Sequence, residues 1–179
     1  MLQTGRRLML AGLCDGVLFT AACDEDVTSP AAAGEADRAF IDGMVPHHEA
    51  ATMMADEALA KAARPELKEM AGQLKADPAR EISQLKAWRR EWFDSDSTPD
   101  PMRMAPIPAG PDFDRVWMQE MIKHHQGAID MSTLAKDAET RSEVCELAEE
   151  IIAAQRAEQA QLRQWLQQWY GVSFSRSSR

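Results

Sequence analysis

The chain has 179 residues, of which 45% are hydrophobic, and a formal net charge of -9 at pH 7. This length allows one domain with a sizeable core, and the acidic balance argues against a nucleic-acid partner, which would call for a basic face. With only five Phe and one Tyr among abundant helix-forming residues, the composition favours an all-α chain over a sheet.

Residues 1–23 have the features of an export signal, some of them typical of the lipoprotein type, which is cleaved and lipidated. Arg6 and Arg7 give a positive start, an apolar run follows, and "TAAC" ending at Cys23 resembles a bacterial lipoprotein cleavage box. The run is interrupted by Asp15 and is too short to span a bilayer. We therefore expect the protein in the periplasm or at the outer face of the cell envelope, with membrane contact only through a lipid on Cys23.

After this signal, residues 24–35 are rich in Ala, Pro and acidic side chains and are expected to form a flexible tether. The rest of the chain contains an internal repeat. Residues 37–93 align without a gap with residues 114–170, and 18 of the 57 positions are identical. The matches include a His-His pair and two tryptophans in each copy, in register, which a chance alignment of helical sequence would not give.

The first copy is predicted to contain two helices. One covers about residues 36–62 and ends at "ARPE", where Pro65 suits the first position of the next helix. That second helix is expected to reach Trp92. Residues 94–111 contain five prolines and cannot continue a helix, so they are predicted to link the copies.

The second copy repeats this plan. Its first helix covers about residues 112–138, and a turn near "ETRSE" follows, with Ser142 as the expected N-cap of the last helix. That helix is expected to reach Trp169, with Gly171 ending it and residues 171–179 forming a tail. Two duplicated hairpins can bury their apolar faces only against each other, which predicts a four-helix bundle over residues 36–170 with pseudo-twofold symmetry.

All four histidines of the chain fall on the faces predicted to point inward, at 100° per residue. Partner helices add one glutamate per copy, Glu81 and Glu158, to otherwise apolar stripes. The inward stripes of the first helix of each copy are Phe40, Met44, His47, His48, Ala51, Met54 and Ala58, and Trp117, Met121, His124, His125, Ala128, Met131 and Ala135.

Imidazole and thioether side chains together form a soft ligand set, which suits Cu(I) and suits Zn²⁺ less well. In the linker, Met102 and Met104 add two thioethers as auxiliary contacts. A purely structural explanation remains open, because methionine is common core filler and an inward histidine can be satisfied by a carboxylate. The spacing also leaves open whether the two His-His pairs share one centre or form two sites.

Three stretches of the sequence resemble a known bacterial family. "FIDGMVPHHEAATMM", "WMQEMIKHHQGAIDM" and "CELAEEIIAAQRAEQAQLRQWL" are similar to the domain-of-unknown-function family 305, over about residues 36–170. The resemblance implies a ferritin-like four-helix bundle, export and, for some members of the CopM type, copper binding or copper tolerance. Carried onto this chain, it implies the ligands Met44, His47, His48, Met54, Met121, His124, His125 and Met131.

The two copies depart from the family pattern in different places. Pro78 stands where the second copy has Gln155, the residue typical of the family, and Lys123 stands where the first copy has Pro46. If Gln155 orients a histidine from behind, the first copy lacks that support. The two halves are therefore expected to be unequal.

The leading hypothesis is a non-enzymatic, extracytoplasmic copper-binding protein that buffers metal or passes it to another copper-handling protein. One alternative is a ferritin-like di-metal oxidoreductase, but neither copy has the Glu-x-x-His motif of such sites. Glu120 stands four residues before His124, and its counterpart is Gly43. The other alternative is a structural or partner-binding bundle without metal.

Overall fold

A computed structural model describes residues 30–138 and 140–174. Its elements are the helices α1 (Pro30–Lys61), α2 (Pro65–Phe93), α3 (Phe113–Asp137) and α4 (Ser142–Tyr170). The prediction of an all-α, ferritin-like four-helix bundle is confirmed. The expected export signal, with Cys23, and residues 175–179 of the tail lie outside the described residues. None of the described helices has the length and apolar character needed to cross a membrane.

The helix ends differ from the predicted ones at two places. The described part of helix α1, from Pro30 on, includes residues 30–35, which were predicted to belong to the tether; alanine is a strong helix former. Ser142 was predicted to be the N-cap of α4, but it is the first helical residue. Arg141 is the N-cap and has the extended backbone conformation of that position. The start of α2 at Pro65 and the end of α4 at Gly171, where φ is 65°, are as predicted.

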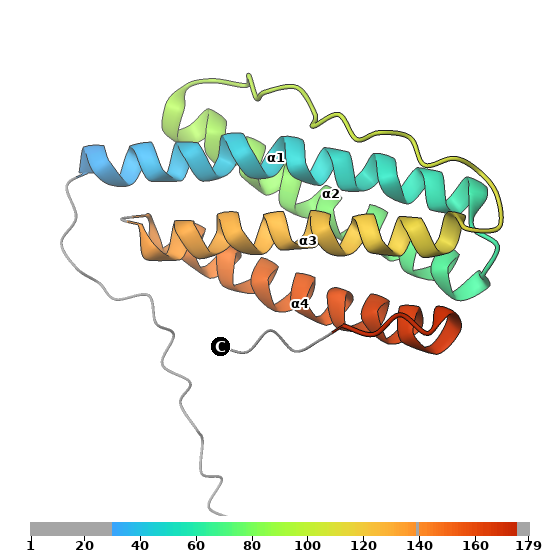
Figure 1. Cartoon of the computed structure of the whole chain (residues 1–179). Helices are drawn as coiled ribbons and strands as arrows, with labels where there is room; N and C mark the ends of the chain where they lie inside the picture. Colours follow the sequence, from blue (N-terminus) through green and yellow to red (C-terminus); the bar gives the residue numbers. More distant parts are fainter. Residues whose placement is uncertain (1–29, 139, 175–179) are drawn as a thin grey trace, which may run out of the picture.

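The two hairpins, α1–α2 and α3–α4, meet chiefly through α1 and α3. These two helices run antiparallel and side by side, with α2 and α4 behind them (Figure 1). The Pro-rich linker, residues 94–112, returns along the outer side of α1 to the start of α3. One face of the bundle thus carries an extended strap of chain.

The inward stripes predicted for the first helix of each copy are buried, except that Met131 is only partly buried, and Glu81 and Glu158 of the partner helices are partly buried as well. The core has two apolar clusters. One contains Met54, Met121 and Trp117, and the other contains Phe40 and Met44. All four histidines are buried as well, and in sequence they stand between the methionines of the two clusters. A buried polar layer therefore divides the apolar core of the bundle.

Each hairpin is also fixed to the other at its turn. Near one end of the bundle, Asp114 at the start of α3 accepts hydrogen bonds from the backbone N–H groups of Ala63 (3.0 Å) and Arg64 (3.1 Å), just before α2. The guanidinium of Arg64 lies 4.2 Å from the ring of Trp169 on α4. Asp114 thereby satisfies backbone donors at the start of a helix in the other copy.

The opposite end repeats this contact with the copies exchanged. Asp37 on α1 accepts a hydrogen bond from the backbone N–H of Arg141 (2.9 Å), and the Arg141 guanidinium lies 4.2 Å from the ring of Trp92. The Asp, Arg and Trp residues of these two end contacts are identical in the repeat alignment. Their role is to hold the duplicated hairpins together, with approximate twofold symmetry.

Candidate metal centre

The two His-His pairs meet at one shared centre. His47 on α1 and His124 on α3 face each other, with ring centroids 3.7 Å apart and ring planes 35° from parallel. Both side chains are nearly inaccessible to solvent, at 3% and 5% exposure. The centre is thus built by both copies of the repeat, across the interface between the two hairpins.

Three of the four ring nitrogens in the facing pair lack hydrogen-bond partners. Nδ1 of His47 and both ring nitrogens of His124 are buried with no hydrogen bond. A buried polar atom left unpaired costs about 1–3 kcal/mol, so this arrangement is expensive for a core that serves packing alone. Each neutral imidazole also has one nitrogen with a free lone pair, which can bind a metal ion.

The second histidine of each pair turns toward the partner helix of its own hairpin. His48 Nε2 lies 2.6 Å from Glu81 Oε2 on α2, and His125 Nε2 lies 2.8 Å from Glu158 Oε2 on α4. The second contact is close but poorly aligned, and neither ring nitrogen of His125 has a hydrogen bond. A carboxylate therefore orients His48 by a hydrogen bond, whereas Glu158 approaches His125 without one.

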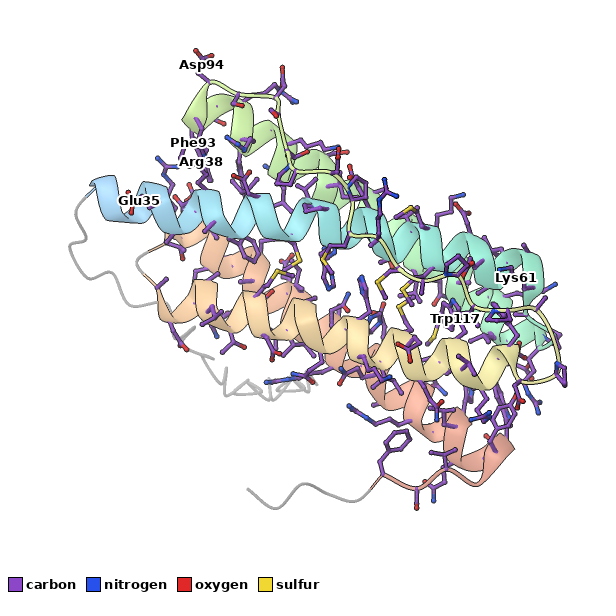
Figure 2. The ribbon with its side chains drawn as sticks, turned by 45° about the horizontal axis from the view of Figure 1, so that its top comes forward. Glu35, Arg38, Lys61, Phe93, Asp94 and Trp117 are labelled. Atoms are coloured by element: carbon purple, nitrogen blue, oxygen red, sulfur yellow. The ribbon has the colours of Figure 1, made fainter. Side chains whose placement is uncertain are left out.

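Methionines flank the histidines on both sides, in pairs drawn from different copies. Met44 of α1 and Met131 of α3 lie in one apolar cluster, while Met54 of α1 and Met121 of α3 lie in the other. Figure 2 shows sulfur atoms in the space between the ribbons of α1 and α3. Because the two helices are antiparallel, the Met that precedes one His-His pair lies in the same cluster as the Met that follows the other.

Two glycines allow the close approach of α1 and α3 at this centre. A Cβ on Gly127 would lie 3.1 Å from His47 Nε2, and one on Gly43 would lie 3.1 Å from Met131 Sδ. Both distances are tighter than ordinary contacts, so a side chain at either position would displace a candidate ligand. The sequence prediction gave Gly127 no role, and its one signal is that of an isolated glycine inside a helical pattern, two residues after His125.

The structure does not show the role that the sequence suggested for Gln155. Its side chain is buried on α4, but its Oε1 has no hydrogen-bond partner, so it orients no histidine by hydrogen bonding. Gln159, which the sequence analysis did not single out, donates instead to the backbone carbonyl of Ile122 on α3 (2.9 Å). Helix α2 runs through Pro78 without a break.

Burial lowers the pKa of His47 to about 4 and that of His124 to about 3, with the neighbouring histidines adding to the effect. The unfolded chain therefore binds more protons than the folded one from pH 6.5 down to about 4, so stability is full above this window and falls within it. We predict that the free energy of unfolding drops by up to about 1.4 kcal/mol per pH unit for each ring.

Urea unfolding of the metal-free protein between about pH 7 and pH 5 measures this slope, above the range in which most carboxylates titrate. A variant in which His47 and His124 are both leucine serves as the control and should show a much smaller slope. Equal slopes for the two proteins would contradict the prediction.

Across residues 30–138 and 140–174, no three His, Cys, Asp or Glu side chains come together in a group able to hold a metal ion. The donors gathered around the centre are imidazole nitrogen and thioether sulfur. Glu120, the acidic residue closest before His124 in sequence, pairs with Lys123 at 2.7 Å. In chemical terms the centre is suited to a soft cation.

Comparison with known proteins identifies relatives that share this fold. A family model described as "Domain of unknown function (DUF305)" matches residues 19–89, 37–113 and 114–177. A structure of CopM in the Ag-bound form is 41% identical, with a TM-score of 0.68, and the match covers 75% of this chain and 98% of CopM. CopM in the Cu(I)-bound form is 39% identical, with a TM-score of 0.66 over the same shares.

A structure of a DUF305 protein from Streptomyces coelicolor is 21% identical, with a TM-score of 0.67, and the match covers 76% of this chain and 94% of that one. At this identity the likeness supports the fold alone. No curated protein matches the sequence.

Proposed function

Because this chain belongs to the DUF305 family, and structures of the related CopM hold copper or silver, we propose that it is a copper-binding protein. The buried centre binds Cu(I) reversibly, through imidazole nitrogens of the facing His47 and His124 and through thioethers beside them. The protein acts by holding the metal, as a buffer or as a donor to another copper-handling protein, and not as an enzyme. Residues 1–23 support a place outside the cytoplasm.

Two facing, buried imidazoles, three of whose four ring nitrogens have no hydrogen-bond partner, are the observation that carries this proposal. A metal ion would satisfy these nitrogens, and the surrounding apolar clusters would exclude water from it. The thioethers of Met44, Met121 and Met54 are buried on either side of the histidines, and thioethers favour the monovalent state of copper. The outer carboxylates, Glu81 and Glu158, would hold the other two histidines in place.

Cu(I) is expected to raise the melting temperature of the protein. A ligand that binds only the folded state adds about 2.7 kcal/mol at a free concentration one hundred times its Kd, which corresponds to roughly 5–10 °C for a domain of this size. Anaerobic melting with Cu(I) held by a competing chelator measures the shift, and excess chelator should reverse it. Identical melting curves with and without Cu(I) would instead favour a structural bundle whose histidines serve packing.

A ferritin-like di-metal oxidoreductase is the competing function, and the described carboxylates do not favour it. Glu81 and Glu158 approach only the outer histidines, and Glu120 pairs with Lys123 on its own helix. The Glu-x-x-His ligands of that class are absent from both copies. Oxygen consumption by the iron-loaded protein distinguishes the two functions.

A further inference from the structure

The linker is fixed against α1 over a short stretch between two anchors. At one end the backbone N–H of Met102 donates to the carbonyl of Pro46 (3.4 Å). At the other end, Lys61 donates to the carbonyl of Ile107 (3.0 Å), and the backbone N–H of Ile107 donates to Glu57 (3.4 Å). The Ile107 side chain is buried in the core. Met104, between these anchors, is therefore held over the surface of α1.

A cavity of about 200 Å³ lies between the linker and α1, and three thioether side chains line it. These are Met53 and Met54 from α1 and Met104 from the linker, with Glu57, Ala105 and Pro106 completing the wall. A second cavity of about 230 Å³ shares Met54, Glu57 and Met104 and reaches Val116 and Glu120 on α3. Three neutral sulfur donors on so small a cavity form a ligand set for a soft monovalent cation.

Met54 connects this cavity to the histidine centre. Its side chain is only 3% exposed, lines the cavity and belongs to the same core cluster as Met121, which precedes His124 by one helical turn. Met53, by contrast, is 45% exposed. Soft donors thus extend from solvent, at Met53 and Met104, through Met54 to the buried centre.

Among residues 30–138 and 140–174, the other side of the bundle has an equivalent groove with fewer sulfur atoms. Met131 is the repeat counterpart of Met54, but Asp130 is the counterpart of Met53, and no residue of the linker lines the groove on this side. The groove there, of about 200 Å³, is lined by Ala36, Ala39, Phe40, Met131, Leu134, Ala135 and Ala138. It contains a single thioether, so of these two grooves in the described part of the chain the one beneath the linker carries the sulfur cluster.

We propose that Met53, Met54 and Met104 form a second soft-cation site, at the surface end of the line of donors that leads to the histidine centre. This proposal rests on the proposed function in that both sites take Cu(I). The cation is held by three thioether lone pairs in an arrangement that the linker completes. Ag(I) is the probe of choice, because it shares the charge and ligand preference of Cu(I) and does not change its oxidation state.

The test is an Ag(I) titration of the full chain carrying ¹³C-methyl methionine, followed by NMR. The methyl resonances of Met53, Met54 and Met104 are expected to shift and to saturate with bound Ag(I). Replacing Met53 and Met104 with leucine should remove one equivalent of Ag(I) and leave the histidine centre able to bind. Met102→Leu is the matched control. Met102 lies on the linker, as Met104 does, but outside the cavity, and its exposure of 44% is close to that of Met53.

The outcomes separate this site from the histidine centre. If Ag(I) binds at the histidines while the methyls of Met53 and Met104 do not respond, the second site is refuted and the proposed function stands. If the Met53→Leu/Met104→Leu protein binds as much Ag(I) as the parent, the second site is also refuted. If these methyls still saturate in a protein with leucine at His47 and His124, the second site is supported independently of the buried centre.

Discussion

Replacing both His47 and His124 with leucine is expected to stabilise the metal-free protein while removing its tight Cu(I) binding. The two rings are buried against each other, and three of their nitrogens have no hydrogen-bond partner. Leucine has a similar volume and no polar atoms, so the free energy of unfolding should rise by about 2 kcal/mol or more. Cu(I) affinity should fall on the order of a hundredfold or more, because the exchange removes both facing nitrogen ligands.

In this experiment stability is expected to rise while Cu(I) affinity falls, and this combination distinguishes a metal centre from a core that serves packing alone. Urea unfolding in the presence of a chelator measures the stability, and anaerobic competition for Cu(I) measures the affinity. Met118→Leu is a suitable control, since Met118 is fully buried on α3 but is not a candidate ligand; it should change neither quantity greatly. A double leucine protein that is less stable and binds Cu(I) as tightly as the parent would contradict the proposed centre.

Asp114→Ala is expected to be among the most destabilising single substitutions away from the centre. The buried carboxylate accepts hydrogen bonds from two backbone N–H groups at the start of α2. Its loss leaves both donors unpaired and frees the α1–α2 turn from α3. We expect the free energy of unfolding to fall by about 3 kcal/mol, as measured by urea and thermal unfolding.

Two further substitutions serve as comparisons for Asp114→Ala. Asp37→Ala at the other end contact should cost less, because Asp37 accepts only one backbone hydrogen bond and burial raises its pKa, so its ionised form already carries a desolvation penalty. Asp112→Ala, whose side chain is 71% exposed in an ion pair with Arg115, should change stability by no more than about 0.5 kcal/mol. A loss for Asp114→Ala no larger than that for Asp112→Ala would show that the end contact does not stabilise the bundle.

Much of the fold could be predicted because duplication and helical periodicity are properties of local sequence. The four helices, the buried stripes and the ends at Pro65 and Gly171 all follow from spacing and from the backbone preferences of proline and glycine. Ser142 was placed wrongly because several residues near the turn suit a helix start, and the extended conformation of Arg141 is fixed by Asp37, which is distant in sequence.

The arrangement of the centre could not be predicted, because periodicity gives the face of a helix but not its register against another hairpin. The sequence grouped Met44 and Met54 with their own His-His pair. The structure instead groups Met44 with Met131 and Met54 with Met121, since α1 and α3 are antiparallel. The facing of His47 and His124 depends on the same register and on the space left by Gly127.

The linker has a consequence for the symmetry of a duplicated protein. Two separate copies of one hairpin could associate as a twofold dimer with two identical grooves. Once the copies are joined in a single chain, the connecting segment can cover only one of them, and here it lines the groove beside Met54 and contributes no residue to the groove beside Leu134. Fusion therefore made equivalent surfaces different in a single step, after which the residues of each could diverge for separate tasks.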